Sequence, residues 1–261
     1  MQMKTNFLNL SNKKFLVTGA SSGIGRATAI KISELGGRVI LNGRDECRLK
    51  ETLSMMDGGG HFAMPFDLLR FDDVKKYIQE CINIDGNRFD GFVFSTGIAR
   101  SQIIRTERIA EFKHVMDINC VTYVALLKEF ASKRVLNNQG SIVAVSSSNT
   151  KQLSKSGMSY TASKAALEAV SAIAAKELVG RGIRINTVLP EATVTPMTIQ
   201  FQNNTTEEQK KQWYPLGALT AEDVANTIVF LLSDTSRKLT GQNIYLSAGN
   251  DGRPIDCIIQ M

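Results

Sequence analysis

Histidine, cysteine and long hydrophobic runs are scarce in this chain of 261 residues, and each scarcity narrows the functions to be considered. Only two histidines occur, His61 and His114, and neither falls in the motifs described below, so we expect no histidine-based proton relay. The four cysteines lack the close paired spacing of zinc sites, and nothing in their arrangement suggests an oxidising compartment. We therefore expect free thiols and no metal site.

No run of about 18 apolar residues occurs, and residues 1–14 lack the apolar segment of a signal peptide. We therefore expect a cytoplasmic protein without a membrane partner. The formal net charge is +6, yet lysine and arginine are dispersed among acids and form no basic block. A nucleic-acid partner is accordingly not expected, whereas a mildly positive surface suits an anionic cofactor.

The sequence does contain a series of short apolar runs separated by helix-like stretches. Seven runs are candidate strands, at residues 15–17, 39–41, 62–64, 92–94, 142–145, 185–189 and 244–246. Strands this apolar, separated by periodic segments of about a dozen or more residues, are typical of a parallel sheet covered by helices on both faces. With 43% hydrophobic residues and no composition shift, residues 1–261 are expected to form a single α/β domain, doubly wound and of the Rossmann type.

A strongly polar stretch, Gln200 to Gln212, lies between the sixth strand and a helix expected to begin near Thr220. This order places it at the carboxyl edge of the sheet, where doubly wound folds bind ligands. We predict a mobile substrate flap at about residues 197–216.

A glycine-rich turn follows the first candidate strand and precedes a helical pattern. Glycine allows the backbone to bend with positive φ and to approach a pyrophosphate, and the helix N-terminus then supplies free N–H groups and a positive dipole. Because strand, turn and helix come in this order, the turn predicts dinucleotide binding rather than a simple tight loop. The residues expected to contact the cofactor here are Gly19, Ser21, Ser22, Gly23, Ile24 and Gly25.

The second candidate strand ends at Asn42-Gly43-Arg44, where a cofactor with a free adenosine ribose would need an acidic residue. Glycine occupies that position, and Arg44, backed by Arg26, offers a planar set of donors to a 2′-phosphate. NADP(H) is therefore favoured over NAD(H). Asp45 falls one residue later and is interpreted as a helix cap. An ordinary surface role for Arg44 is the alternative.

Tyr160 and Lys164 are four residues apart in a helix-forming stretch, so they share one helix face. Lowering the pKa of a tyrosine by one unit requires roughly 1.4 kcal/mol of preference for the charged phenolate, and the Lys164 ammonium can supply it. This pair alone is common in helices. Ser147, at the end of the fifth strand and thirteen residues before Tyr160, adds a hydroxyl that can meet the phenol.

Together, the Thr-Gly-x-x-x-Gly-x-Gly turn at Thr18, the Tyr-x-x-x-Lys pair and the preceding serine resemble the compact form of the short-chain dehydrogenase/reductase family. The resemblance extends from about Lys13 to Gly249. It implies that Asn119 completes a catalytic tetrad with Ser147, Tyr160 and Lys164 by holding a water that links the lysine to solvent. It also implies that Lys164 holds the nicotinamide ribose hydroxyls.

The same resemblance implies further cofactor contacts. Asp67 and Leu68 match the pair that contacts the adenine ring, and Gly97 belongs to a triplet at the place of the family's Asn-Ala-Gly. Backbone atoms near Pro190 and Thr193, together with Thr195, would hold the nicotinamide carboxamide. The further cofactor-binding residues implied by the resemblance are Asp67, Leu68, Gly97, Tyr160, Lys164, Pro190, Thr193 and Thr195.

Three segments depart from the family pattern. Ser95-Thr96-Gly97 lacks the amide that braces the central strand, and serine and threonine are expected to brace it in another way. Glu191 replaces the glycine of the Pro-Gly pair, which affects the substrate pocket more than the chemistry. Ser247-Ala248-Gly249 stands where Val-Asp-Gly-Gly is usual, which affects a subunit contact or the pocket.

These features predict an NADPH-dependent carbonyl reductase or alcohol dehydrogenase in which Tyr160 gives its proton to the carbonyl oxygen and Ser147 holds that oxygen. The leading expectation is a reductase similar to bacterial 3-oxoacyl-acyl-carrier-protein reductases, acting on an acyl thioester. A sugar or other small ketone or alcohol is the alternative substrate. A catalytically silent NADP-binding regulator is a further alternative, for which a broken tetrad would be expected. The resemblance also implies a homo-oligomer, either a dimer or a tetramer.

Overall fold

The computed structural model describes residues 8–199 and 205–250. In these residues seven parallel strands form one sheet in the order β3-β2-β1-β4-β5-β6-β7. The order reverses beside β1, which is the mark of a doubly wound fold. The seven candidate strands and the predicted α/β class are confirmed. The strands are β1 Lys14–Val17, β2 Arg38–Gly43, β3 Phe62–Pro65, β4 Phe89–Phe94, β5 Leu136–Val145, β6 Arg184–Pro190 and β7 Asn243–Leu246.

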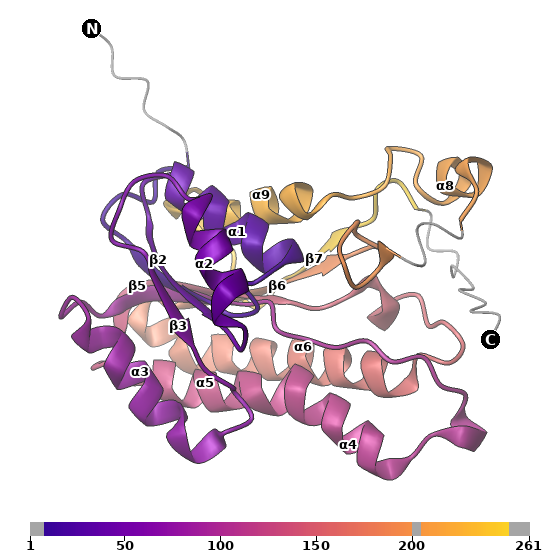
Figure 1. Cartoon of the computed structure of the whole chain (residues 1–261), viewed down its shortest axis with the longest axis horizontal. Helices are drawn as coiled ribbons and strands as arrows, with labels where there is room; N and C mark the ends of the chain where they lie inside the picture. The colour runs from indigo at the N-terminus through magenta and orange to yellow at the C-terminus, as the bar shows by residue number, and fades with distance from the viewer. Residues whose placement is uncertain (1–7, 200–204, 251–261) are drawn as a thin grey trace, which may run out of the picture.

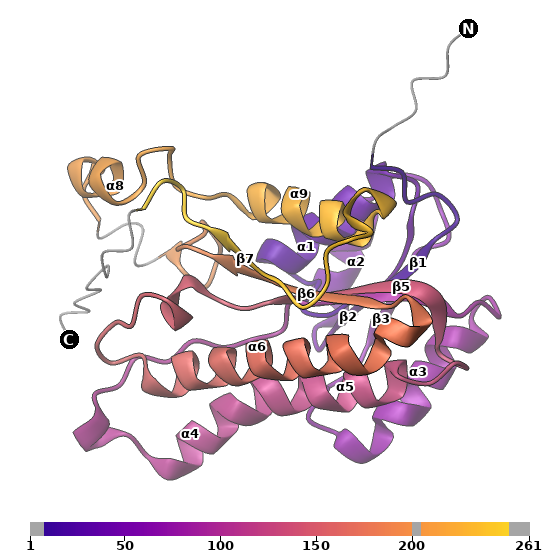
Figure 2. The ribbon, with the colours of Figure 1, turned by 180° about the vertical axis from the view of Figure 1, so that it is seen from behind.

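Helices cover both faces of the sheet (Figures 1 and 2). The helices α1, α2 and α9 lie on one face, and α3, α5 and α6 lie on the other, with α4 running into α5 through a π-helical turn at Asp117–Val121. The helices are α1 Gly23–Glu34, α2 Glu46–Ser54, α3 Val74–Asn83, α4 Ile109–Met116, α5 Thr122–Phe130, α6 Met158–Leu178, α8 Glu207–Trp213 and α9 Ala221–Leu232. Short 3-10 turns lie at Phe71–Asp73, Ile104–Thr106, Ser148–Thr150, Val179–Arg181 and Asp234–Ser236.

The central strands are apolar on both sides because each side packs against a helical layer. In β5, Ile142 and Ala144 belong to the core beneath α3, α5 and α6, whereas Val143 and Val145 belong to the core beneath α1 and α9. This alternation follows from the two-residue period of a strand. It holds the carboxyl ends of the strands, and the loops that follow them, in fixed positions.

Polar side chains fix the ends of several helices. Asp45 accepts a hydrogen bond from the Arg48 amide at 3.0 Å, so the interpretation of Asp45 as a helix cap is confirmed. Thr220 caps α9 in a reciprocal arrangement with Asp223, and the expected start of that helix is also confirmed.

The predicted flap lies only partly within the described residues. Residues 200–204 fall outside them, whereas residues 207–213 form the helix α8. Thr206 and Gln209 cap this helix reciprocally. The polar composition of this stretch is thus partly that of an exposed, capped helix.

No helix within residues 8–199 and 205–250 is long and apolar enough to cross a bilayer. The same residues contain no group of three or more histidine, cysteine, aspartate or glutamate side chains that could hold a metal ion.

Candidate active site

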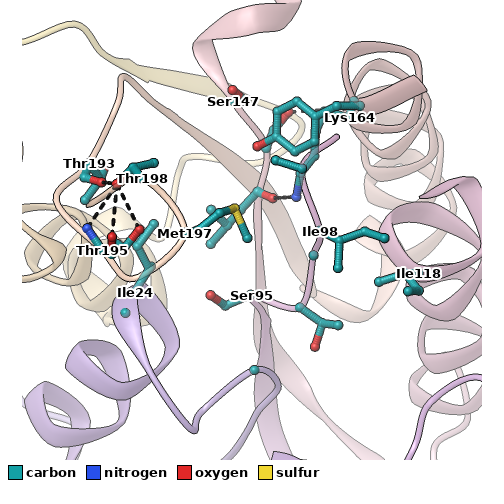
Figure 3. Close-up of a pocket in the computed structure, with 18 of the residues that line it drawn as sticks. Ile24, Ser95, Ile98, Ile118, Ser147, Lys164, Thr193, Thr195, Met197 and Thr198 are labelled. Carbon is teal, nitrogen blue, oxygen red and sulfur yellow. Dashed lines mark hydrogen bonds between the residues drawn. The ribbon is translucent and has the colours of Figure 1, made fainter. Parts of the chain in front are cut away.

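A cavity of about 640 Å³ opens at the carboxyl edge of the sheet. Residues from the loops after β1, β2, β4, β5 and β6, and from the start of α6, line it. Lys164 and Thr195 lie on opposite sides of this cavity, and Ile24 and Ser95 lie along it (Figure 3). Catalytic and cofactor-binding candidates that are distant in sequence therefore share one space.

The three central candidates meet where β5 ends and α6 begins. Ser147 follows β5, is 8% exposed, and its Oγ accepts a hydrogen bond from the Asn149 amide at 3.2 Å. Tyr160 and Lys164 lie on successive turns of α6, and the Lys164 Nζ is 5.8 Å from the centre of the Tyr160 ring. All three side chains line the cavity.

The Tyr160 phenol does not respond to Lys164 in the way the sequence suggested. Desolvation raises the pKa of Tyr160 above its ordinary value, and the Ser147 hydroxyl is the group that acts against this rise. The expected lowering of the phenol pKa by Lys164 is therefore not seen in the protein alone. A phenol with a raised pKa stays protonated at neutral pH.

Lys164 is 4% exposed, and its Nζ donates a hydrogen bond to the Val145 carbonyl oxygen at 2.7 Å. Burial lowers the pKa of Lys164 to about 8, although Cys120 and Glu168 act in the opposite direction. A buried ammonium held mainly by a carbonyl keeps donors for another partner.

Asn119 lies in the π-helical turn between α4 and α5 and is fully buried. Its Oδ1 accepts from the Ile98 amide at 2.8 Å, and its Nδ2 donates to the Ile98 carbonyl at 3.0 Å and to the Ser163 Oγ at 2.9 Å. Asn119 thus braces the loop after β4. A Cβ on Gly97 would lie 3.3 Å from both Asn119 Oδ1 and Lys164 Nζ, so glycine allows this loop to pass close to the lysine. The water-holding role of Asn119 stays a prediction.

The glycine-rich turn has the geometry that its residues predict. Gly19 has φ +65°, and a Cβ there would lie 2.8 Å from the Ser95 carbonyl oxygen. A Cβ on Gly25 would lie 2.3 Å from the Gly19 carbonyl oxygen. Ser22 begins α1 without a side-chain cap, and the first turn of the helix contains no acidic residue. The free N–H groups of this 12-residue helix can therefore bind an anion.

The two arginines near the turn have different surroundings. Arg44 is exposed and lines the cavity. Arg26 binds both carboxylate oxygens of Glu51, at 2.9 and 2.8 Å, and also donates to the Ser21 carbonyl. The expectation that Arg26 backs Arg44 is therefore wrong for this structure, because Glu51 already occupies the Arg26 guanidinium.

Apart from Gly25, the remaining cofactor candidates also line the cavity. Leu68 is 4% exposed, and Asp67 is held by its hydrogen bond from the Leu69 amide at 3.0 Å. Across the cavity, Thr198 accepts from the Thr195 amide at 3.1 Å and donates to the Thr193 carbonyl (Figure 3). The other predicted cofactor-binding residues on the lining are Gly19, Ser21, Ser22, Gly23, Ile24, Arg44, Gly97, Pro190, Thr193 and Thr195. Asn119 and Gly25 do not line it and instead shape its wall.

Comparisons with known proteins agree with this geometry. A family model described as enoyl-(acyl carrier protein) reductase matches residues 19–251. Glucose 1-dehydrogenase from Gluconobacter oxydans is 33% identical, with 92% of each chain covered. A 3-oxoacyl-[acyl-carrier-protein] reductase from Staphylococcus epidermidis is 29% identical, covering 91% of this chain and 98% of its own. A putative gluconate dehydrogenase structure from Agrobacterium tumefaciens superposes with a TM-score of 0.85 at 25% identity, covering 93% of this chain and 97% of its own.

The chain belongs to the short-chain dehydrogenase/reductase family. The resemblance inferred from the sequence is confirmed, and the protein is an oxidoreductase of a family that binds a nicotinamide cofactor. One departure of the sequence from the short-chain dehydrogenase/reductase pattern, at Ser95 and Thr96, has a structural explanation.

Thr18, a residue of the glycine-rich motif that was not among the predicted site residues, accommodates the serine and threonine in place of the family's Asn-Ala. Thr18 Oγ1 accepts hydrogen bonds from the Ser95 amide at 3.1 Å and from the Thr96 amide at 3.3 Å. Thr18 therefore ties the ends of β1 and β4 together. Its place in the Thr-Gly motif was the available signal. Thr198, which organises the loop that carries Thr195, had no comparable signal in the sequence.

Proposed function

We propose that this protein is a cytoplasmic NADP(H)-dependent carbonyl reductase or alcohol dehydrogenase, with Tyr160 as the acid/base group. One observation carries the proposal: Ser147, Tyr160 and Lys164 line the same cavity as the glycine-rich turn that opens α1. A carbonyl that is held by Ser147 and Tyr160 would thus lie in one space with a nicotinamide.

The residues present fit a dinucleotide. Uncapped N–H groups at the start of α1 suit a pyrophosphate, and Gly19 leaves room for its close approach. Asp67 and Leu68 would hold the adenine, and Pro190, Thr193 and Thr195 the nicotinamide side. When bound, the cofactor supplies or accepts a hydride.

In reduction, Tyr160 would donate its phenolic proton to the substrate oxygen, and Ser147 would hold that oxygen by a hydrogen bond. The raised pKa of Tyr160 keeps the phenol protonated before the reaction. Lys164 would bind ribose hydroxyls with donors that its bond to the Val145 carbonyl leaves available. Asn119, through a water, would return the proton to this pair.

The phosphorylated cofactor is favoured because Arg44 is exposed on the cavity wall and Gly43 replaces an acidic residue. Arg44→Ala is expected to weaken NADPH binding about tenfold and to leave NADH binding nearly unchanged, because it removes a charge-assisted hydrogen bond to the 2′-phosphate. Fluorescence titration measures the dissociation constants of NADPH and NADH. Arg48→Ala, an exposed neighbour that does not line the cavity, is the matched control. An unchanged NADPH/NADH ratio in Arg44→Ala would remove Arg44 from the site.

Two substrate classes follow from the comparisons. The 3-oxoacyl-acyl-carrier-protein reductase relative supports an acyl thioester, and the glucose 1-dehydrogenase relative supports a sugar. A screen that follows NADPH absorbance with 3-oxoacyl thioesters, keto sugars and diketones in reduction, and aldoses in oxidation, tests the proposed reaction. Tight NADPH binding with no turnover across the panel would instead support the silent regulator.

We also propose a single functional domain that assembles as a homo-oligomer. Exposed apolar side chains on the outer helices, including Ile109, Val124 and Ile173, support burial against another copy of the chain. Light scattering coupled to size exclusion tests the assembly, and a monomer at micromolar concentration would contradict it.

A further inference from the structure

Glu168 is a buried carboxylate on α6, one helical turn beyond Lys164. It is 7% exposed, and with Tyr160 and Lys164 it falls on successive turns of one helix face. It does not line the cavity, so any effect of Glu168 on the reaction must pass through another residue. Burying a carboxylate is costly unless hydrogen bonds compensate for the lost water, and the partners of Glu168 therefore indicate its role.

The Glu168 carboxylate holds the turn that carries Ser147 on both sides. Its Oε1 accepts hydrogen bonds from the Ser146 hydroxyl at 2.6 Å and from the Thr150 hydroxyl at 2.7 Å. Each hydroxyl also lies near a backbone carbonyl, at the longer distances of 3.4 and 3.0 Å. Because a hydroxyl has one proton and an anionic acceptor forms the stronger bond, the carboxylate is the main partner of both. The residues that flank Ser147 are thus fastened to α6.

The second oxygen of Glu168 is held from the sheet. Asn243 Nδ2, at the start of β7, donates to Oε2 at 2.9 Å, and Lys151 Nζ approaches it at 3.4 Å. The Lys151 side chain is 50% exposed, so solvent screens this ion pair and Asn243 is the stronger partner. Asn243 is itself fixed, because its Oδ1 accepts from the Thr187 hydroxyl at 2.5 Å. The carboxylate therefore joins the Ser147 turn, α6 and β7 at one point.

The proposed reaction requires Ser147 and Tyr160 to reach the same substrate oxygen. The two residues lie on different elements, and residues 151–156 between those elements belong to no helix or strand. A misplacement of about 1 Å in an active site can cost about a hundredfold in rate. The hydrogen bonds of Glu168 connect the turn to the helix directly and so fix the distance between the two hydroxyl groups.

We propose that Glu168 is a positioning residue, whose carboxylate holds the Ser147 turn against α6 so that Ser147 and Tyr160 meet one substrate oxygen. This inference rests on the proposed oxidoreductase function. Because Glu168 lies outside the cavity lining, we expect it to affect kcat more than the binding of NADPH.

Thr150→Val tests the bond to the turn, because it keeps the shape of the side chain and removes the donating hydroxyl. Thr150 does not line the cavity, so a loss of turnover must pass through the turn. The kcat is expected to fall about three- to tenfold, with the KM for NADPH within about twofold. Thr150→Ser, which restores the hydroxyl, should recover most of the lost kcat.

Thr240→Val is the matched control for Thr150→Val. Thr240 is also half-buried, and its hydroxyl accepts from the Ile185 amide at 3.1 Å near the amino end of β6. Both variants should lower the urea midpoint to a similar extent, but Thr240→Val should keep kcat within about twofold of the wild type. The probes are 3-oxobutanoyl thioester and 2,3-butanedione reduced with NADPH and D-glucose oxidised with NADP⁺. The variants are compared on the probe with the highest wild-type kcat/KM.

Glu168→Gln tests the carboxylate itself. The amide keeps one acceptor oxygen but places an N–H group opposite the Asn243 amide, so kcat should fall about ten- to a hundredfold. Glu177→Gln, the same change at an exposed position on α6, is the control and should leave kcat unchanged. If circular dichroism shows that Glu168→Gln does not fold, Ser146→Ala replaces it and should lower kcat about three- to tenfold. Its control is Ser171→Ala, which removes another hydroxyl that is 2% exposed.

Wild-type turnover separates this inference from the proposed function. Turnover in the wild type together with an equal kcat in Thr150→Val and Thr240→Val would overturn the positioning role alone. A wild-type kcat in Glu168→Gln would overturn it as well. Absence of turnover with all three probes in the wild type would count against the proposed function and would overturn the positioning role with it.

Discussion

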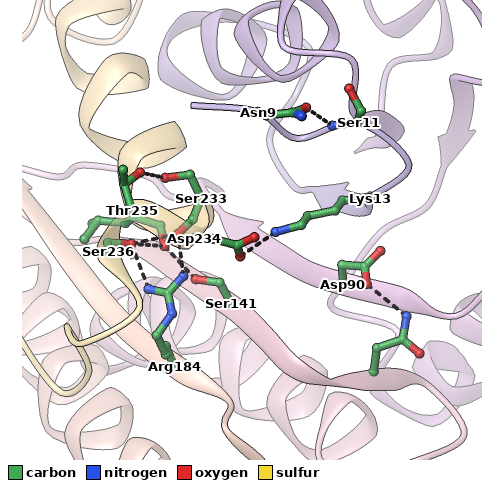
Figure 4. Close-up of polar contacts among 12 residues, drawn as sticks. Asn9, Ser11, Lys13, Asp90, Ser141, Arg184, Ser233, Asp234, Thr235 and Ser236 are labelled. Carbon is green, nitrogen blue, oxygen red and sulfur yellow. Dashed lines mark hydrogen bonds and ion pairs between the residues drawn. The ribbon is translucent and has the colours of Figure 1, made fainter. Parts of the chain in front are cut away.

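The two ends of the sheet differ in the partners of their buried polar side chains. At the amino end, charged side chains are satisfied within the fold: Arg184 donates to Ser236 Oγ at 2.9 Å and to the Ser233 carbonyl at 3.0 Å (Figure 4). Lys14, 1% exposed, binds Asp85 at 2.5 Å. At the carboxyl end, Ser147, Tyr160 and Lys164 instead line an open cavity of about 640 Å³.

The partners of the buried cations distinguish a functional site from a structural network. Both ends contain buried cations, so burial of charge alone does not mark function. Lys14 meets a carboxylate and two carbonyls, whereas Lys164 meets one carbonyl and has its pKa lowered to about 8. A perturbed cation with donors left over in a cavity is the functional pattern. If the comparison is correct, substitutions at the carboxyl end should reduce turnover and those at the amino end should reduce stability.

Tyr160→Phe should give the largest effect. It removes the proposed proton donor, so turnover is expected to fall about a hundred- to ten-thousandfold while NADPH binding changes little. Tyr123→Phe is the matched control, because it removes a buried hydroxyl that bonds to Ser171 Oγ at 2.9 Å outside the cavity lining. That control should lose about 1 kcal/mol of unfolding free energy and keep its turnover. Near-normal reduction by Tyr160→Phe would refute the role of the phenol.

Arg184→Leu should show the converse behaviour. It removes two buried hydrogen bonds, to the Ser236 hydroxyl and to the Ser233 carbonyl, so the free energy of unfolding in urea should fall by about 1–3 kcal/mol. Turnover per folded molecule should stay within about twofold of the wild type. The exposed Arg237→Leu is the control and should change neither quantity. A large loss of turnover in Arg184→Leu without a loss of stability would mean that the two ends are not separable.

The pH dependence of Lys164 gives an intermediate effect. Burial lowers its pKa from 10.5 to about 8, so the ammonium is present below pH 8 and is lost as the pH rises through about 8. If this ammonium binds the ribose hydroxyls, NADPH affinity should weaken about tenfold towards pH 9.5. Titration in the Tyr160→Phe background measures affinity without turnover, and Lys164→Met should abolish the pH step.

The same titration affects stability with a defined sign. Between pH 8 and 10.5 the unfolded lysine binds more protons than the folded one, so the contribution of Lys164 to stability improves as the pH rises.

An NADPH affinity that is constant from pH 7 to pH 9.5 would argue against the charged lysine as a ligand of the cofactor.

The sequence predicted those parts of the site that local patterns determine. Apolar runs gave the seven strands, and the glycines of the first turn gave its position because their backbone geometry is local. Contacts between residues that are distant in sequence could not be predicted from local patterns. Glu51, on α2, accepts hydrogen bonds from Arg26 on α1, and the pKa of Tyr160 is raised because the folded cavity wall buries the phenol. Likewise, Tyr245 meets Glu191 only because β7 pairs with β6.

Lys13→Ala should have the smallest effect, because it removes an exposed ion pair at the amino end of the sheet. Lys13 binds Asp234 at 2.7 Å, but the Asp234 side chain is 80% exposed, so solvent screens the pair (Figure 4). The expected loss of unfolding free energy is below about 1 kcal/mol, and it should vanish near 1 M salt, where the Debye length is about 3 Å. Asp234→Asn should show at least this loss, because Asp234 also acts on the charge of Arg184. Adding Lys13→Ala to Asp234→Asn should cause no further loss, because the ion pair is already absent. A salt-independent loss above about 2 kcal/mol would show that the buried network extends to the surface at Lys13.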